Sequence, residues 1–386
     1  MNSLLTNFPA AKAVPSAGDG FARVAQSAQS SEANGFYKLA FRAMSTHCQV
    51  NCHGVTAKVA SDFQQAVIAW VAAFEARYSR FIPDSLIGRI NAAAGEHWVE
   101  TDPETDRLFQ LCHELFFFTR GSFDPTALPL IQLWNWKDNP PRVPEEHTIQ
   151  AARALVGWNK IQRRPGGIFL PHRGMALDLG GIGKEYAVDR VMNLAAERGI
   201  QNILVDFGQD VRVRGHAPGK KFWTIGLDDA TQPGKCWAGV AVTDHAVATS
   251  GDYLRHFTVN GRRYGHILDP RTGYPAFNDC RAVSVIGPLI GHCRVDFEMV
   301  VQQALQSLGV AAAVGLVGAC HEQGEVLLFC LVAGKVGMDA LCDLAKQRLE
   351  TRRRVKLLGL LVGAKCGLVG FVRTLTRFLG APARGV

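Results

Sequence analysis

The chain has 386 residues, of which 47% are hydrophobic and 20% charged, as in a globular protein with a sizeable core. Its length allows one large domain or two to three small ones. The net charge is +8, but most of the excess lies in the last forty residues, where Glu350 is the only acid. The rest of the chain is near neutral, so the charge gives no reason to expect a nucleic-acid partner.

The ten cysteines are scattered, and Cys48 and Cys52 are the only close pair. Without a second pair at zinc-ligand spacing, we expect free thiols in a reducing compartment. Residues 1–35 are rich in Ala, Ser and Gly and lack a secretory signature, so we expect a flexible leader. No uninterrupted apolar run is long enough to predict a membrane span.

Hydrophobic periodicity predicts helices early in the chain and a long run of strands later. We expect strands over 36–53 with a turn near Ser45-Thr46, and an amphipathic helix over 61–78. A short helix should end near 90–95, and a longer one should occupy 103–119. The loop 122–130, held extended by two prolines, is a candidate ligand wall or a packed connection. We further expect a helix at 148–155 and strands at 160–164, 167–170, 223–227, 240–243 and 282–286. Residues 203–215 should form a strand, a turn and a second strand.

Residues 175–198 are predicted to form a strand, a glycine-rich turn and a helix. Gly180, Gly181 and Gly183 would let backbone N–H groups approach a ligand at a helix N-terminus, and Lys184 in the first turn could hold a pyrophosphate. The glycine spacing fits neither a dinucleotide-fold fingerprint nor a P-loop. From these residues alone, a structural turn and a phosphate site remain equally open. Because helices precede a run of strands, the fold class is α+β with mixed or antiparallel sheets.

Residues 244–275 are unusually polar for a core segment. We expect a turn at Thr249-Ser250-Gly251, then a hairpin around Asn260-Gly261 that returns His266 beside it, and a closing turn at 269–273. The stretch is interpreted either as a phosphate- or nucleotide-handling site or as two ordinary turns flanking a hairpin.

In chain order, these stretches resemble the ApbE family of flavin transferases, over about residues 38–286. The matching motifs are Ala43-Met44-Ser45-Thr46, Tyr78-Ser79-Arg80-Phe81, Asn91-Ala92-Ala93, Phe123-Asp124-Pro125-Thr126, Asp178-Leu179-Gly180-Gly181-Ile182-Gly183-Lys184, Asp206-Phe207-Gly208-Gln209-Asp210, Thr249-Ser250-Gly251-Asp252-Tyr253 and His266-Ile267-Leu268-Asp269-Pro270-Arg271-Thr272-Gly273. Each motif is modest, but their common order is specific. The resemblance implies the T-fold-like ApbE architecture and favours a ligand site over ordinary turns.

The resemblance also implies an activity, protein flavinylation. The enzyme would split FAD and attach FMN through a phosphoester to a Thr or Ser of a target protein, with magnesium assisting. The target is expected to be a subunit of a membrane redox complex. His266 would act as general base on the acceptor hydroxyl or orient groups around it.

By the same resemblance, a set of residues would bind FAD and the metal. The expected FAD contacts are Met44, Tyr78, Ala127, Leu128, Asp178, Lys184, Thr249, Ser250 and Ile267. The carbonyl of Gly181 would be a magnesium ligand, since magnesium accepts backbone oxygens. Thr249-Ser250 and His266 would face the glycine turn.

The sequence departs from the family after the strand at 282–286. The family has an Asp followed four residues later by Thr, which complete the metal site, whereas here Asp296 is followed by Val300. An alignment that instead shifts the register places Met299 and Gln303 at the two positions. We therefore expect an incomplete metal site, and the rival hypothesis is an FAD-binding or scaffold protein without transferase activity.

The resemblance fades beyond about residue 287. We divide the chain into a leader (1–35), a flavin-transferase domain (36–310) and a basic, Leu-, Val- and Gly-rich tail (311–386). Either a frame shift in the gene or a divergent family member with a basic amphipathic tail would explain this. In the second case, residues 356–380 could make a peripheral contact with an anionic membrane surface. The five glycines of that segment make a poor helix, which favours the frame shift. Resequencing the gene tests the frame-shift hypothesis. The missing signal suggests the cytoplasm, although members of the family are often periplasmic or membrane-anchored, so the compartment stays open.

Overall fold

The computed structural model describes residues 18–229, 232, 234–251, 254–276, 282–287, 318–322, 325–329 and 355–356. Its centre is a seven-stranded sheet in the order β1-β2-β3-β7-β8-β11-β16, in which every neighbouring pair is antiparallel. The strands are β1 (Gln29–Ala33), β2 (Phe36–Ala43), β3 (Thr46–His53), β7 (Asn202–Phe207), β8 (Asp210–Arg214), β11 (Ala246–Gly251) and β16 (Ala282–Gly287). The α+β class predicted from the sequence is confirmed.

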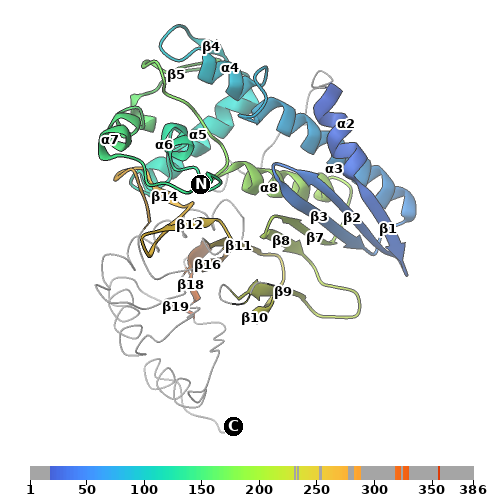
Figure 1. Ribbon diagram of the computed structural model, residues 1–386. Helices are drawn as coiled ribbons and strands as arrows, with labels where there is room; N and C mark the ends of the chain where they lie inside the picture. Colours follow the sequence, from blue (N-terminus) through green and yellow to red (C-terminus); the bar gives the residue numbers. More distant parts are fainter. Residues whose placement is uncertain are drawn as a thin grey trace.

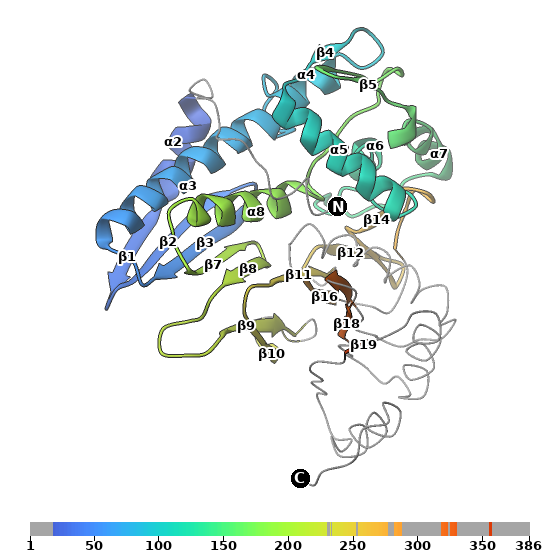
Figure 2. The same ribbon diagram turned by 180° about the vertical axis from the view of Figure 1, so that it is seen from behind.

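Three helices cover one face of this sheet (Figures 1 and 2). They are α2 (Gly18–Ser27), α3 (Ala57–Tyr78) and α8 (Gly183–Ala196). Thr56 caps α3, because its side-chain oxygen accepts the N–H of Val59 at 3.3 Å. The apolar faces of these helices and of the central strands form the largest core cluster, which includes Phe41, Phe63 and Phe207.

A second helical layer continues from α3 and carries its own core. It contains α4 (Leu86–Ala92), α5 (Pro103–Phe118) and a 3₁₀ turn (Trp158–Lys160), with a small sheet of β4 (Val99–Glu100), β5 (Gln162–Arg164) and β6 (Gly167–Phe169). Asp102 caps α5 by accepting the N–H of Thr105 at 2.9 Å. Met44 packs against both this cluster and the central one, so it lies at their junction.

Three smaller groups complete the described chain. The hairpin β9 (Trp223–Asp228) and β10 (Cys236–Val242) packs on β8 and β11. Helices α6 (Leu128–Leu133) and α7 (Glu146–Ala154) share a core with the hairpin β12 (His256–Val259) and β13 (Arg262–Gly265) and with β14 (Leu268–Asp269) and β15 (Tyr274–Pro275). A further sheet pairs β17 (Gly318–Glu322), β18 (Glu325–Phe329) and β19 (Val355–Lys356).

The structure corrects three sequence predictions. Residues 18–33, expected within a flexible leader, form α2 and β1, because Val24 is fully buried against the central core. The expected turn at Thr249-Ser250-Gly251 is the end of strand β11, where small side chains fit between β8 and β16. The expected strand before the glycine turn is reduced to an isolated bridge between Ala127 and Ala176.

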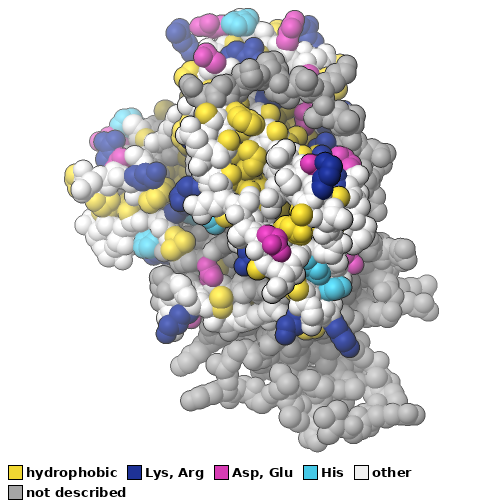
Figure 3. Space-filling model, turned by 90° about the vertical axis from the view of Figure 1, so that its right-hand side faces the viewer, with side chains coloured by type: hydrophobic (Ala, Val, Ile, Leu, Met, Phe, Trp, Pro, Cys, Tyr) yellow, Lys and Arg dark blue, Asp and Glu magenta, His cyan; other side chains and the backbone are white. Residues whose placement is uncertain are grey.

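The surface seen from the side of α2, α3 and β1 has hydrophobic side chains gathered in one upper area (Figure 3). Basic and acidic side chains are interspersed around it, as expected for a body that is near neutral.

Among the residues described, no helix combines the length and the apolar character needed to cross a bilayer.

The turn between β7 and β8 depends on glycine at position 208. Gly208 has φ +66°, and an added Cβ would lie 2.3 Å from Thr46 Oγ1. Gly208→Ala is therefore expected to lower the free energy of unfolding by about 2–4 kcal/mol, from the left-handed backbone plus overpacking. Urea unfolding measures this. Gly199→Ala is the control, since Gly199 has φ +70° but open space around the new Cβ; an equal loss in both variants would contradict the role of the Thr46 contact.

Candidate functional site

Two tight turns meet at one end of the central sheet. Met44 and Ser45 join β2 to β3, and Gly208 and Gln209 join β7 to β8. The N–H of Gly208 donates to the carbonyl of His47 at 3.0 Å, which fixes one turn against the other. These turns come from the Ala-Met-Ser-Thr and Asp-Phe-Gly-Gln-Asp motifs, which are far apart in the sequence.

Helix α8 begins beside these turns and presents Lys184. Its N-cap residue, Ile182, makes no side-chain cap, and the N–H of Gly183 donates to Leu179 O at 2.7 Å. Lys184 forms an ion pair with Asp210, the first residue of β8, whose side chain is 5% exposed. The structure thus places the lysine at a helix N-terminus, as predicted, and gives it a buried acidic partner.

The segment before α8 is held by polar contacts on both sides. Asp178 accepts the N–H of Gly180 at 2.9 Å and pairs with the guanidinium of Arg80 at 3.3 Å. Asn91 donates to the carbonyl of Leu177 at 3.0 Å and accepts its N–H at 2.6 Å. Asp178, a predicted FAD contact, therefore has a fixed orientation next to the glycine turn.

The loop 122–130, a candidate ligand wall or a packed connection, packs against the same segment. The N–H of Asp178 donates to Pro125 O at 2.8 Å, and Ala127 forms a parallel bridge with Ala176. Ala127 and Leu128 are both buried where α6 begins. The structure thus brings these two predicted contacts close to Asp178.

The Asp-Pro-Thr motif in this wall has a structural role. Asp124 accepts the N–H and the hydroxyl of Thr126 at 2.8 and 2.6 Å, and the N–H of Trp158 at 3.1 Å. Thr126 is fully buried and accepts the N–H of Gly157 at 2.7 Å. Burial raises the pKa of Asp124, and the hydrogen bonds from Thr126 oppose that rise.

Tyr78 lies in the second core cluster at the end of α3. It is 5% exposed, and its hydroxyl shares a hydrogen bond of 2.9 Å with Thr105 Oγ1. Its ring packs on Phe74 with the centroids 4.9 Å apart. Burial raises its pKa. A flavin contact by Tyr78 stays a prediction.

The remaining predicted contacts come from β11 and from the hairpin behind it. Thr249 shares a hydrogen bond of 2.8 Å with Ser284 across the pair β11–β16, and Ser250 is the next residue of β11. The half-buried His266 follows β13, and its N–H donates to Arg255 O at 3.0 Å. The carbonyl of Ile267 accepts the N–H of Ala276 at 2.8 Å. The roles of these four residues stay predictions.

The predicted metal ligands are only partly within the described chain. Gly181 lies in the turn before α8, whereas Asp296 and Val300 lie outside the described residues. In the described ranges, no three His, Cys, Asp or Glu side chains gather closely enough to hold a metal ion. The described side chains therefore do not complete a magnesium site around Gly181.

Asp206 adds a perturbed carboxyl group to this end of the sheet. Burial raises its pKa, and the neighbouring charge of Asp210 adds to the rise, while the N–H of Gln209, His47 and Lys184 oppose it. A carboxyl group with a raised folded-state pKa contributes stability that is complete below its unfolded pKa, about 3.9, and lost as the pH rises through the folded value.

Asp206→Asn removes this pH dependence. The amide oxygen can still accept the N–H of Gln209, which lies 2.9 Å from Asp206 Oδ1. The free energy of unfolding of the variant minus that of the wild type should therefore rise from about pH 4 upwards, by about 1.4 kcal/mol for each pH unit that separates the unfolded pKa from the folded pKa. Urea titrations at a series of pH values measure it; a difference that falls with rising pH would contradict the raised pKa.

The structure identifies three residues that sequence reasoning did not assign. Asp210 is the partner of Lys184, Arg80 orients Asp178, and Glu75 accepts the N–H of Met44 at 3.1 Å. Asp210 and Arg80 lie within the motifs shared with the family, so the sequence could have indicated a role for them. Glu75 stands on a helix otherwise interpreted as amphipathic and gave no such signal.

The sequence of this chain is similar to those of known proteins. The sequence profile of the ApbE family matches residues 44–298. A relative from Klebsiella pneumoniae strain 342, named FAD:protein FMN transferase, is 32% identical over 206 residues, which cover 53% of this chain and 63% of the relative. A relative of the same name from Treponema pallidum is 32% identical over 224 residues, covering 53% and 61%. The chain thus spans less than two thirds of the length of these two relatives.

Solved structures agree with the sequence match. The crystal structure of the ApbE protein of Thermotoga maritima has a TM-score of 0.63 and 30% identity, and the match covers 70% of this chain and 87% of that one. The apo form of the Pseudomonas stutzeri flavinyl transferase ApbE has a TM-score of 0.60 and 25% identity, covering 71% and 84%.

Proposed function

This chain belongs to the ApbE family, and we propose that it transfers FMN from FAD to a protein acceptor. The observation that carries the proposal is Lys184 at the N-terminus of α8, behind a glycine-rich turn and next to the β7–β8 turn. The N–H groups of Gly180 and Gly183 donate to Asp178 and Leu179, so it is the helix dipole and the ammonium group that suit a pyrophosphate. The relatives named FAD:protein FMN transferase support the same reaction.

The reaction moves one phosphoryl centre. The hydroxyl oxygen of a Thr or Ser in the acceptor attacks the phosphorus of the FMN half of FAD, and the bond between the two phosphates breaks. AMP leaves with the electron pair, and the hydroxyl proton passes to a base. Such a reaction needs positioning and charge neutralisation more than covalent chemistry.

The residues of this chain would divide these tasks. Lys184 would release Asp210 and neutralise the pyrophosphate, while Met44, Asp178 and the Ala127-Leu128 segment would contact FAD. His266 would take the proton of the acceptor hydroxyl or orient the groups around it.

Magnesium belongs to the proposal through the family resemblance. It would add positive charge near the phosphates, and Gly181 would supply one carbonyl ligand. Because the described residues do not complete a site, no step is assigned to the ion. The acceptor is proposed to be a subunit of a membrane redox complex.

The test is incubation of the full chain with FAD, magnesium and an acceptor peptide that carries the target Thr. We expect flavin that stays on the peptide after denaturation, with AMP released in equal amount. A peptide with Ala in place of Thr is the control and should stay unmodified. Tight FAD binding without transfer under any divalent metal would instead support the rival, a flavin-binding or scaffold protein, for which the Asp296–Val300 departure gives a reason.

A further inference from the structure

We propose that Glu75 is a positioning residue for the Met44–Ser45 turn, and that Arg23 of α2 holds Glu75 in place. Glu75 does not touch the flavin in this proposal; it fixes the backbone that does. The identification of the ligand as FAD rests on the proposed function. We call Glu75, Arg23 and the Met44–Ser45 turn the clamp, and the evidence for it is the contacts of the described residues.

The backbone conformation of this turn is unfavourable, so the turn needs a stabilising contact from another element. Ala43 pairs with Thr46, so the connection is a two-residue hairpin of Met44 and Ser45. Their φ angles are +51° and +59°, the left-handed region at both positions. This region favours Gly and Asn, and neither Met nor Ser adopts it readily.

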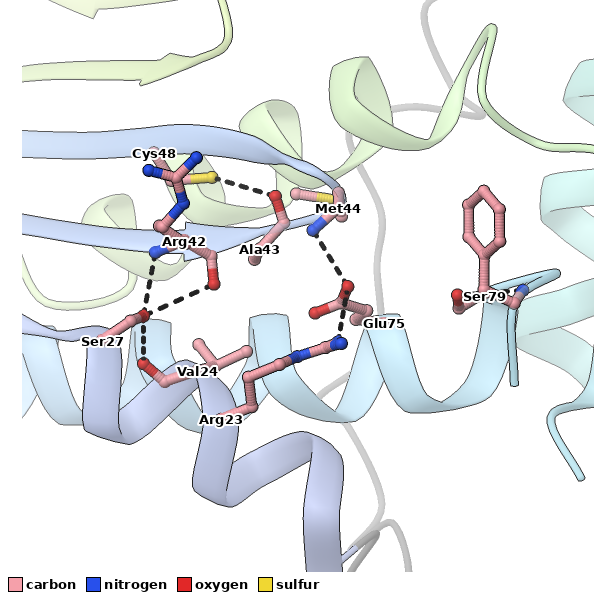
Figure 4. Close-up of polar contacts among 10 residues, drawn as sticks. Arg23, Val24, Ser27, Arg42, Ala43, Met44, Cys48, Glu75 and Ser79 are labelled. Carbon is pink, nitrogen blue, oxygen red and sulfur yellow. Dashed lines mark hydrogen bonds and ion pairs between the residues drawn. The ribbon is translucent and has the colours of Figure 1, made fainter. Parts of the chain in front are cut away.

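Glu75, in the last turn of α3, supplies this contact (Figure 4). Its Oε1 accepts the N–H of Met44 at 3.1 Å and lies 2.9 Å from the guanidinium of Arg23. The side chain of Glu75 is 9% exposed, whereas that of Arg23 is 62% exposed. The hydrogen bond therefore joins α3 to the turn inside the protein. Arg23 forms its ion pair with Glu75 from the protein surface.

The burial of one Glu75 oxygen is energetically unfavourable, which argues for a role beyond stability. Its second oxygen, Oε2, is buried and has no hydrogen-bond partner in the described structure. A buried carboxylate oxygen without a partner loses the hydration it would have in water, which makes the residue a poor choice for stability alone.

Helix α2 provides the outer support of this clamp. Ser27 accepts the N–H of Arg42 at 2.9 Å and donates to Val24 O at 2.8 Å, which fixes α2 along the end of β2. Both Ser27 and Arg23 precede residue 44, where the match to the family profile begins. The chain therefore supports its turn with residues outside the matched span.

The clamp lies close to the proposed phosphate site. Cys48, on the strand that follows the turn, has a pKa that burial raises to about 12, and the charges of Asp206, Glu75 and Lys184 all act on its thiol. The hydrogen bond from Gly208 to the carbonyl of His47 joins the β7–β8 turn to β3 just after the Met44–Ser45 turn. Asp210, at the start of β8, pairs with Lys184. A displaced Met44 turn would alter the wall next to Lys184.

The test measures FAD affinity by flavin fluorescence in the full chain. Glu75→Ala should weaken FAD binding about tenfold, the value of one lost hydrogen bond to a charged group. Glu75→Gln keeps an acceptor for Met44 and should stay within about threefold. Arg23→Ala should have a smaller effect than Glu75→Ala, because the Arg23 side chain is 62% exposed and its charge is screened by water. Lys58→Ala, on the exposed face of α3, is the control and should bind FAD as the wild type does.

A rescue separates positioning from general stability. Ser45→Gly removes the backbone penalty at one turn position, so Glu75→Ala/Ser45→Gly should recover most of the lost affinity. If Ser45→Gly raises the melting temperature of the Glu75→Ala variant without restoring FAD binding, Glu75 is merely structural and the proposal is wrong. Unchanged affinity in Glu75→Ala would also overturn it.

Amide hydrogen exchange distinguishes this proposal from the proposed function. Without FAD, Glu75→Ala should exchange the amides of residues 43–46 about tenfold faster than the wild type. If the wild type does not bind FAD but this exchange accelerates, the flavin function fails and the clamp stands. If the wild type binds FAD and the exchange is unchanged, the clamp fails and the function stands.

Discussion

Replacing Lys184 by alanine is expected to weaken FAD binding about 10- to 100-fold, the value of a charge-assisted contact with phosphate. The same change leaves Asp210, which is 5% exposed, without its cation. Breaking a buried ion pair on one side costs about 3–5 kcal/mol, so the free energy of unfolding should fall by an amount of this order. Flavin fluorescence and urea unfolding measure the two effects separately.

The double variant Lys184→Ala/Asp210→Asn separates binding from stability. Without the buried negative charge, most of the lost stability should return, but FAD affinity should stay low because the ammonium group is still absent. Recovery of FAD affinity in the double variant would show that Lys184 acts only as a structural partner of Asp210. Unchanged affinity in the single variant would contradict the pyrophosphate role directly.

Asp124→Ala is expected to lower the free energy of unfolding by about 2–4 kcal/mol, because it leaves partly buried donors without an acceptor. The donors are the N–H groups of Thr126 and Trp158 and the hydroxyl of Thr126. Since Thr126 also accepts from Gly157, the change should loosen the wall that holds Ala127. Urea unfolding measures the loss.

A matched aspartate provides the control for this effect. Asp62 is 54% exposed and, among the residues that the structure describes, pairs only with Lys58 on the surface of α3. Asp62→Ala should therefore leave the stability nearly unchanged, as exposed ion pairs contribute little. A similar loss in both variants would contradict the assignment of Asp124 to a buried hydrogen-bond network.

Much of the fold could be predicted because periodicity and capping act locally. The helix predicted over 61–78 is α3, which begins four residues earlier at Ala57 because Thr56 caps it. The hairpin predicted around Asn260-Gly261 is β12–β13. In contrast, Ala-Val-Ala-Thr-Ser-Gly over 246–251 contains the residue types of a polar turn. It is a strand because β8 and β16 pair with it from both sides, which no local pattern reveals.

The site was predictable to the extent that motifs carry it. Lys184 at a helix N-terminus and the glycine turn before it follow from local sequence. The partners of these residues could not be predicted, because they are set by tertiary contacts. Glu75 reaches Met44 across 31 positions of the chain, and Asp210 reaches Lys184 across 26.

Flavin transfer is best tested by following the two phosphorus atoms of FAD separately. The full chain is incubated with magnesium, an acceptor peptide carrying Thr, and FAD labelled either on the FMN-side or on the AMP-side phosphorus. We predict that the FMN-side label becomes covalently attached to the peptide while the AMP-side label appears only in free AMP. Label from either position remaining in intact FAD, with an unmodified peptide, would contradict the proposed transferase function.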